Sequence, residues 1–267
     1  MSRERDRARR RRSSGPGTSQ VISGRRAVTE ALRAGRVSEV LIVSSPKVTQ
    51  GMRSLLEQAH ADDVSVRTVP RATLDALADE HQGVVARIAP EASEALGERD
   101  LAAFPFEEDA LVVVLDGITD PQNLGAAARS AEAAGAAMLV TRTRRAAEVT
   151  PAAVRASAGA LVHLPHARVA NVARAIERLQ DAGFWVVGLD QTADVTVYEE
   201  DCPEGRVAVV IGSEGEGMAR LTRERCDQLL SLPMRGRVGS LNAAAALAAV
   251  LYAYVVPRER RASNPAG

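Results

Sequence analysis

The chain has 267 residues, enough for one large domain or two modest ones. Hydrophobic residues make up 46% and charged residues 25%, a composition that excludes disordered, fibrous and membrane-embedded classes of protein. The 34 basic residues balance the 34 acidic ones, so the net charge gives no indication of a nucleic-acid partner. Aromatic residues are only 3%, which disfavours recognition of bases by rows of stacking rings.

Cysteine content and hydropathy indicate the compartment. Cys202 and Cys226 are the 2 cysteines, too few for a disulfide framework or a four-thiolate zinc site. The longest apolar run, residues 243–256, is shorter than the roughly 20 residues that span a bilayer, and it predicts a buried helix. Because the N-terminal region is charged, no secretory signal is expected. These features predict a protein of the reducing cytoplasm without membrane contact.

Local charge and the positions of Gly, Pro and Ser divide the chain into five segments. Residues 1–17 hold seven arginines and two acidic residues, which predicts a disordered basic arm. Such an arm either tethers nucleic acid through counterion release or serves only as a solubilising tail. The remaining segments are a small α/β domain, an acidic linker, a larger α/β domain and a flexible tail, at residues 18–90, 91–109, 110–258 and 259–267.

Hydrophobic periodicity predicts the elements of both domains. In the smaller domain, helices are expected at residues 26–33, 51–60 and 74–78, and strands at 40–43 and 64–69. In the larger domain, strands are expected at residues 111–115, 137–140, 184–189 and 207–211, and helices at 123–134, 151–158, 169–182 and 222–230. Because strands alternate with helices, the larger domain is expected to be a mostly parallel sheet covered on both faces.

A first motif spans residues 116–129, from the carboxyl end of a predicted strand into a helix. Open α/β sheets place their ligands in the crevice beside such turns. Arg129 lies about two turns into this helix, on a face of small residues. It is predicted either to hold a phosphate or another substrate oxygen, or to form a salt bridge at an interface. Asn123, near the start of the helix, contacts substrate or caps the helix.

A second motif, residues 210–217, is a strand that runs into a glycine-rich loop. It lacks the Lys-Ser/Thr pair of a phosphate-binding loop, and Glu214 and Glu216 would repel an anion. The motif therefore favours a neutral or cationic ligand. A tight turn without a ligand is the alternative.

A third motif, residues 232–242, enters the apolar helix. Ser240 is predicted to cap that helix. Asn242 is a polar side chain at the start of a buried helix, so it must find hydrogen-bond partners. Leu232, Met234 and Leu241 are apolar and are expected to form walls for a flat ring.

Other candidate residues give weaker signals. His163 and His166 are spaced for one helix face but lack a third ligand nearby, so no metal site is expected. The chain has no Gly-x-Ser-x-Gly sequence, and neither cysteine has an activating partner nearby. Tyr252 and Tyr254 are expected to be core or interface residues.

Together, and in this order, the three motifs resemble those of the SpoU/TrmH family of RNA 2'-O-ribose methyltransferases, in the SPOUT superfamily. Residues 24–32 and 81–86 resemble the substrate-binding domain of the family. The layout is most similar to the bacterial enzymes that methylate a guanosine of 23S rRNA. Related members act on a tRNA guanosine or confer antibiotic resistance on ribosomes.

The resemblance implies a fold and a methyl donor. The fold is an α/β, SPOUT-type parallel sheet with a C-terminal trefoil knot, preceded by a small α/β RNA-binding domain. The donor, S-adenosylmethionine, is held in the knot through backbone groups at positions matching Gly212, Leu232 and Leu241. The resemblance also implies a homodimer, with the last helix and the helix of the first motif at the interface, and no metal.

The resemblance also assigns roles to side chains. Arg129 is nearest to a catalyst at the ribose 2'-hydroxyl, Asn123 positions the substrate, and supporting residues match Glu214, Ser240 and Asn242. Because arginine keeps its proton up to about pH 12, a substrate phosphate held by Arg129 is an alternative proton acceptor. The sequence therefore leaves open which group acts as the general base for the 2'-hydroxyl.

The sequence departs from the family after Asn242. Many members have Val-Ser there, whereas this chain has Ala243 and Ala244, so a hydroxyl contact at that place is in doubt. In the smaller domain, four arginines are expected either to contact RNA phosphates or to line a solvated helix face. They are Arg25, Arg26, Arg33 and Arg36.

The expected activity is methylation of a ribose 2'-hydroxyl in RNA by S-adenosylmethionine, at a guanosine of 23S rRNA. Three alternatives stay open. They are a tRNA guanosine methyltransferase, a ribosomal RNA resistance methyltransferase, and a ribosome-assembly factor that binds RNA without turnover.

Overall fold

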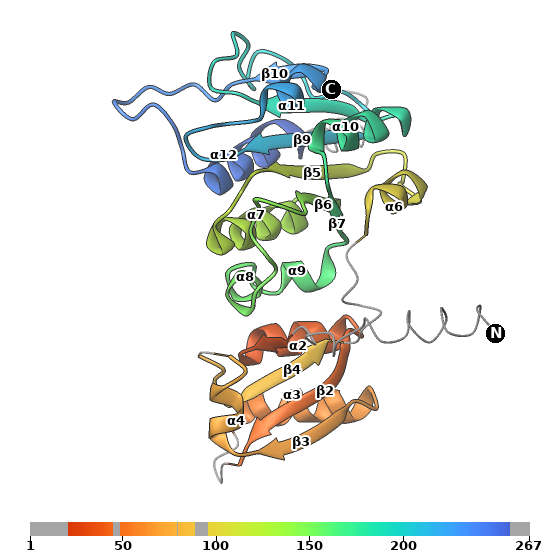
Figure 1. The fold of residues 1–267 in the computed structure, drawn as a ribbon, viewed down its shortest axis with the longest axis vertical. Coiled ribbons are helices and arrows are strands. Elements are labelled where there is room, and N and C mark those ends of the chain that lie inside the picture. The colour runs from red at the N-terminus through yellow and green to blue at the C-terminus, as the bar shows by residue number, and fades with distance from the viewer. Residues whose placement is uncertain (1–20, 45–48, 79, 89–95, 257–267) are drawn as a thin grey trace, which may run out of the picture.

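The computed structural model describes residues 21–44, 49–78, 80–88 and 96–256. The arm expected at residues 1–17 and the tail expected at 259–267 lie outside these ranges. The described chain forms a four-stranded sheet in its first part and a six-stranded sheet in its second part, each packed against helices (Figure 1).

The four-stranded sheet has the order β1-β4-β2-β3, in which β2 is parallel to β3 and antiparallel to β4. Its strands are β1 (Val21–Ser23), β2 (Val37–Val43), β3 (Ser65–Val69) and β4 (Val84–Ile88). Its helices are α2 (Arg25–Arg33), α3 (Gln50–Ala61) and α4 (Arg71–Asp75). The sequence did not predict β1 or β4, because pairing with each other and, for β4, with β2 defines them rather than a local pattern.

The helix expected at residues 74–78 begins earlier, at Arg71. Pro70 precedes it with φ of −57°, and the fixed φ of proline favours the start of a helix at the next residue. The expected position was therefore wrong by about one turn.

The six-stranded sheet has the order β10-β8-β9-β5-β6-β7, and every neighbouring pair is parallel. This confirms the predicted parallel sheet. Its strands are β5 (Leu111–Asp116), β6 (Ala136–Arg142), β7 (His166–Val169), β8 (Trp185–Leu189), β9 (Val207–Gly212) and β10 (Gln228–Leu230). Its helices are α6 (Glu98–Ala103), α7 (Pro121–Ala133), α8 (Pro151–Ala156), α9 (Ala160–His163), α10 (Val172–Asp181), α11 (Arg220–Arg225), α12 (Ala243–Val250) and the π-helical turn η1 (Leu251–Val255).

Strand β5 shows why the central strands are apolar throughout. Val113 and Leu115 belong to the buried cluster that contains residues of α7 and α12. Val112 and Val114 belong to the cluster on the other face, which contains residues of α10. Because helices cover both faces, both sets of alternating side chains must be apolar.

Two expected helices of the larger domain were partly wrong. The start of the segment at residues 169–182 belongs to β7, and the end of the segment at 222–230 is β10. Both are edge strands of three or four residues, too short for hydrophobic period to distinguish strand from helix. As a result His163 ends α9 and His166 begins β7, so they do not share a helix face.

Part of the expected acidic linker is folded. Glu98–Ala103 form α6, and Leu101 and Phe106 are buried in the cluster that includes α10 and the larger sheet. Residues 96–109 therefore pack as part of the larger domain, whereas residues 91–95 lie outside the described ranges.

Polar contacts join the two domains. A guanidinium nitrogen of Arg36 donates to the carbonyl of Val162, and Arg155 Nη1 donates to Ser23 Oγ at 2.9 Å. His163 Nε2 lies 3.5 Å from Glu30 Oε2. One cluster of buried residues runs from the larger sheet through α7 and α8 into α2. These contacts fix the orientation of the smaller domain against α8 and α9.

Helix α7 packs closely on α8 because Gly125 has no side chain. A Cβ at Gly125 would lie 2.5 Å from the carbonyl oxygen of Ala153 and 2.5 Å from Ala156 Cβ. Neither neighbour is the end of a flexible side chain, so a larger residue must separate the helices. Within the described ranges, every helix is too short or too polar to span a bilayer.

We expect Gly125→Ala to destabilise the protein. Alanine in place of glycine improves helix propensity by about 1 kcal/mol. Ordinary overpacking of a core costs about 1–3 kcal/mol, and a clash with backbone costs more, so the net effect is a loss of stability. Urea unfolding should show a free energy of unfolding lower by about 1–3 kcal/mol.

The matched control is Gly51→Ala in α3, where a Cβ meets nothing within 4 Å. That variant should be as stable as the parent chain or more stable by about 0.5–1 kcal/mol. An equal urea midpoint for Gly125→Ala and the parent would contradict the close packing of α7 on α8.

Candidate active site

The carboxyl ends of β5 and β9 lie side by side at the centre of the larger sheet. Asp116, the last residue of β5, is in register with Gly212, the last residue of β9. Strands β6 and β7 lie on one side of this pair, and β8 and β10 lie on the other. The chain thus leaves β5 and β9 at a point where the strand order changes direction, which is where open α/β sheets bind ligands.

Three polar side chains from the three motifs meet beside this edge. Asn123 Nδ2 donates to Glu214 Oε1 at 2.7 Å, and Asn242 Nδ2 donates to the same oxygen at 2.6 Å. Asn242 Nδ2 also lies 2.8 Å from Asn123 Oδ1, which accepts from it. Segments separated by 91 and 28 positions therefore share one carboxylate oxygen. We call this group the Asn–Glu–Asn cluster.

The helix caps leave Asn123 free for this contact. Asp120 caps α7, since its carboxylate accepts from Gln122 N at 2.9 Å, and Asn123 lies inside the helix. The expected cap of α12 at Ser240 is wrong, because Asn242 is the cap: its Oδ1 accepts from Ala244 N and Ala245 N. Asn242 can do both, since its oxygen faces the helix while its nitrogen faces the cluster.

The second motif is a tight loop that folds back on its own strand. Ser213 and Gly217 form an antiparallel bridge with hydrogen bonds of 3.1 and 2.9 Å. A Cβ at Gly212 would lie 2.0 Å from the carbonyl carbon of Gly217, so only glycine permits this approach. The loop presents Glu214 and Glu216 at its exposed tip.

Asp116 is a buried carboxylate whose role the sequence did not indicate. Its Oδ2 accepts from Ala219 N at 2.9 Å, and its Oδ1 lies 2.9 Å from Arg142 Nε. It therefore ties β5 to the chain just after the second motif. An aspartate at the end of an otherwise apolar strand is the signal that could have identified it.

Arg129 lies on α7 and is exposed to solvent. Within the described ranges it has no ion pair and no hydrogen bond. A salt bridge with a second subunit stays its alternative role. Its guanidinium is free to bind an anion.

The third motif is exposed along most of its length. Leu241 is 45% exposed and Met234 is 37% exposed, whereas Leu232 packs partly against the core. Ser240 is exposed and makes no side-chain hydrogen bond within the described ranges. Leu241 directly precedes Asn242 of the Asn–Glu–Asn cluster, so its exposed side chain is available to a flat apolar ligand.

The four arginines expected to contact RNA differ in their surroundings. Arg26 is exposed, Arg33 pairs with Glu30 at 2.8 Å, and Arg25 Nη1 donates to Thr49 Oγ1 at 2.8 Å. Arg36 is half-buried in the domain contact, where burial lowers the pKa of its guanidinium. Arg36 is thus engaged by the protein itself.

The remaining titratable candidates are not activated. Burial, followed by the charges of nearby aspartates, raises the pKa of the Cys226 thiol to about 12, so the thiolate is absent at neutral pH. Burial, with a smaller effect of Arg168, lowers the pKa of His166 to about 4. Among the described residues, no group of three or more His, Cys, Asp or Glu side chains is arranged to hold a metal ion.

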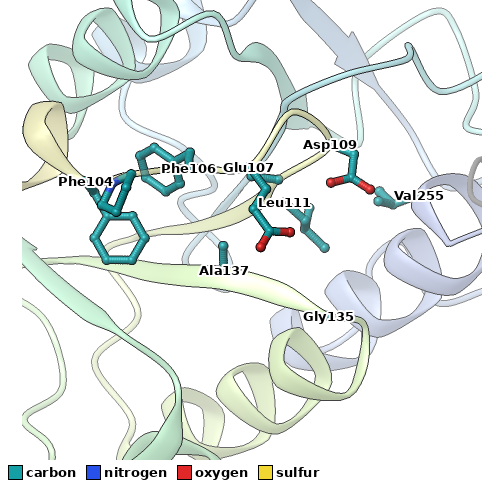
Figure 2. Close-up of a pocket in the computed structure, with 10 residues that line it drawn as sticks. Phe104, Phe106, Glu107, Asp109, Leu111, Gly135, Ala137 and Val255 are labelled. Carbon is teal, nitrogen blue, oxygen red and sulfur yellow. The ribbon is translucent and has the colours of Figure 1, made fainter.

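A cavity of about 360 Å³ lies at the opposite end of the strands (Figure 2). Leu111 and Ala137, near the amino ends of β5 and β6, contribute to its wall. Figure 2 shows Phe104 and Phe106 at one end of the cavity and Asp109 at the other. Because this cavity is far along the strands from Asp116 and Gly212, it is separate from the Asn–Glu–Asn cluster.

Two family models match the chain. Residues 110–252 match the SpoU rRNA Methylase family, and residues 21–93 match the domain described as RNA 2'-O ribose methyltransferase substrate binding. The first match covers the larger sheet with all three motifs, and the second covers the smaller domain.

Individual relatives agree with these matches. A Bacillus subtilis protein assigned by its name to the TrmH family of tRNA/rRNA methyltransferases is 40% identical over 249 residues, which cover 92% of this chain and 97% of that protein. The crystal structure of the SpoU methyltransferase AviRb from Streptomyces viridochromogenes, in complex with AdoMet, is 31% identical with a TM-score of 0.74. It covers 91% of this chain and 90% of that one.

An AdoMet-bound rRNA methyltransferase of Sinorhizobium meliloti has the same fold, with a TM-score of 0.74 at 24% identity over 97% of this chain and 91% of that one. The fold, the order of the motifs and the family models agree across both domains. The chain therefore belongs to the SpoU/TrmH family of RNA 2'-O-ribose methyltransferases.

Proposed function

We propose that the protein uses S-adenosylmethionine to methylate the ribose 2'-hydroxyl of a guanosine in 23S rRNA. The observation that carries the proposal is the Asn–Glu–Asn cluster, because it joins all three motifs of an RNA ribose methyltransferase at one oxygen. The AdoMet complex of AviRb supports the choice of donor. A tRNA guanosine is the second candidate substrate, since the name of the B. subtilis relative includes both RNA classes.

The residues beside the cluster fit the proposed donor. Leu241 and Met234 are exposed apolar side chains and are proposed to contact the adenine ring. Leu232 and Gly212 are proposed to contact the donor through their backbone groups, as the family resemblance implies. Glu214 and Glu216 supply negative charge, which suits a cationic sulfonium. When bound, S-adenosylmethionine supplies an electrophilic methyl group.

The side chains of the chain itself then have to position the RNA. Arg129 is free to bind a substrate phosphate and to neutralise its charge. Both polar atoms of the Asn123 amide are held, Nδ2 by Glu214 and Oδ1 by Asn242, so its orientation is fixed before substrate arrives. Ser240, two residues before Asn242, is proposed to extend the rim of the site. Alignment of the 2'-hydroxyl supplies most of the rate enhancement, and no metal is required.

The proton of the 2'-hydroxyl must leave during transfer. Arg129 is a poor acceptor because guanidinium keeps its proton at neutral pH. The phosphate that Arg129 holds is the acceptor we favour, and the arginine then acts by orienting it.

The smaller domain is proposed to bind the RNA around the target nucleotide. Arg25, Arg26 and Arg33 lie on or at the start of α2 and are available as phosphate contacts. Arg36 is left out of this set, because it holds the domain contact. The arm at residues 1–17 adds an electrostatic tether to RNA.

We also propose the homodimer, the trefoil knot and the cytoplasmic location that the family resemblance implies. Tyr252 is 52% exposed and its hydroxyl donates to the carbonyl of Ala133, so the last helix and the end of α7 share a surface. That surface supports the proposed dimer interface.

The activity is tested with purified protein, labelled S-adenosylmethionine and unmodified 23S rRNA or tRNA transcripts. We expect label on ribose, in nucleotides that resist alkaline hydrolysis, with 23S rRNA as the preferred substrate. Donor binding without transfer to either RNA would contradict the enzyme and favour an RNA-binding factor. Transfer to tRNA alone would replace the proposed substrate with the second candidate, and transfer to an adenosine or uridine of 23S rRNA would overturn guanosine.

Arg129→Ala should lower kcat for methyl transfer by at least about a hundredfold, because the group that orients the phosphate is lost in the transition state. Equilibrium titration should show donor affinity changed by no more than about twofold. Arg178→Ala, which removes a partly exposed arginine from α10, is the matched control and should leave both quantities unchanged. Equal losses of donor binding and transfer in Arg129→Ala would contradict the role given to Arg129.

Two replacements of Glu214 separate the contribution of its negative charge from that of its acceptor oxygen. Glu214→Gln keeps an acceptor oxygen for both asparagine amides, so transfer should fall by only about fivefold through loss of the charge. Glu214→Ala removes the acceptor and should lower transfer by about a hundredfold, with little change in melting temperature because the residue is exposed. If both variants lose activity equally, the activity does not depend on the hydrogen bonds of the cluster, and the proposed role of Glu214 as their acceptor is contradicted.

A further inference from the structure

A second cavity, of about 180 Å³, lies in the smaller domain at the loop between α4 and β4. Its wall contains one apolar side chain and several polar ones. The lining residues are Val43, Arg71, Asp75, Glu80, His81, Gln82 and Gly83. The proposed activity assigns nothing to this cavity.

A buried histidine holds the acidic group of the cavity in place. His81 Nδ1 accepts from Gly83 N at 2.9 Å, so the neutral ring carries its proton on Nε2. Nε2 then donates to Asp75 Oδ1 at 2.9 Å. Arg71 Nε lies 3.8 Å from the same Oδ1, so these two side chains are paired across the cavity. The Asp75 side chain remains 55% exposed, and its Oδ2 has no hydrogen-bond partner within the described ranges. The cavity thus presents a fixed acceptor to whatever enters it.

Two residues of the loop between α4 and β4 adopt an energetically unfavourable backbone conformation. Glu80 and Gln82 both have φ of 52°, in the left-handed region that costs energy for residues other than glycine. Gly83 has φ of 84°, and a Cβ there would lie 3.2 Å from Val43 Cγ1. The hydrogen bonds of His81, together with Gln82 Oε1, which accepts from Arg25 N at 3.4 Å, hold the loop in this shape.

A series of contacts between side chains and helices connects the cavity with the Asn–Glu–Asn cluster. Glu80 Oε2 is 3.9 Å from Arg155 Nε of α8, and α8 packs against Gly125 of α7. Helix α7 carries Asn123 and Arg129. In Figure 1 the loop between α4 and β4 lies below α8, on the same side of the molecule as the carboxyl end of β5. The cavity and the cluster are thus connected through α8, which contacts Glu80 at the cavity and packs on the helix that carries Asn123.

We propose that this cavity binds one unpaired nucleotide of the RNA substrate, outside the methylated one. Asp75 accepts a hydrogen bond from the amino group of the base, Arg71 contacts its phosphate, and Val43 lies against the base. A carboxylate only accepts hydrogen bonds, so Asp75 favours the exocyclic amino group of adenine, cytosine or guanine. Uracil offers only its ring N3–H, which lies between two carbonyl oxygens that the carboxylate repels, so the cavity prefers the other three bases over uracil. The nucleotide must be unpaired, because base pairing occupies its Watson–Crick edge and keeps the base stacked within the helix. This inference rests on the proposed function in one respect, that the ligand is the RNA substrate.

The test measures binding of full-length protein to labelled single-stranded oligo(A), oligo(C) and oligo(U) of about 12 nucleotides, by fluorescence anisotropy over a series of salt concentrations. The parent chain should bind oligo(A) and oligo(C) about fivefold or more tightly than oligo(U). Asp75→Asn should abolish this preference, because an amide both donates and accepts. Arg71→Gln should weaken all three and reduce the slope of log K against log salt by about 0.7.

Arg67→Gln is the matched control, since it removes an arginine of the same domain that is 58% exposed and paired with Glu39 at 3.4 Å. It should leave the base preference unchanged. Retention of the preference in Asp75→Asn, an unchanged salt slope in Arg71→Gln, or no binding of any oligonucleotide by the parent chain would overturn the proposal.

Methyl transfer is measured separately on the same proteins. Asp75→Asn and Arg71→Gln should raise KM for the RNA by about tenfold with kcat unchanged, as expected for a contact made equally in ground and transition states. If both variants transfer methyl groups with an unchanged KM for the RNA, the proposed nucleotide site is contradicted, whereas the proposed methyltransferase activity is not. Absence of transfer by the parent chain overturns the activity, while the oligonucleotide preferences still decide whether the cavity binds a base.

Discussion

Glu214 Oε1 is the point at which three distant parts of the chain are held together. Asn123 reaches it from α7 and Asn242 from the start of α12, so the loop after β9 is fixed against both helices. The parallel pairing of β5 with β9 makes this possible, because it brings the two strand ends into register at Asp116 and Gly212. A carboxylate shared by two amides satisfies polar groups that stand at the edge of a buried core.

The arrangement of charge explains how a chain with no net charge can act on RNA. Arg129 is free of partners within the described ranges, whereas Arg36 is used to join the domains. Near the cluster the loop is acidic, which suits a cationic donor rather than a phosphate. The acidic groups of the loop after β9 and the unpaired guanidinium of Arg129 thus lie on different motifs, and each can bind a ligand group of opposite charge.

The domain contact connects the smaller domain to the helix that carries Asn123. Arg155 reaches Ser23 and lies near Glu80 of the smaller domain, while its own helix packs on the glycine face of α7. The proposed nucleotide site at the loop around His81 is thus connected to Asn123 through the contacts of α8 with the smaller domain and with α7. Strained backbone at Glu80 and Gln82 is consistent with a site shaped before the ligand arrives.

The sequence alone determined the alternation of strands and helices, the three motifs and the family, because buried parallel strands are apolar at every position and loops at their carboxyl ends must carry the chemistry. Only the tertiary structure decided the rest. Edge strands β7 and β10 are too short to show a hydrophobic period. Asn242 caps α12, whereas the sequence predicted Ser240. The contact of Arg36 with Val162 and the burial of Asp116 depend on segments far apart in the chain. No local pattern records such pairings, since they arise from packing between elements rather than within one.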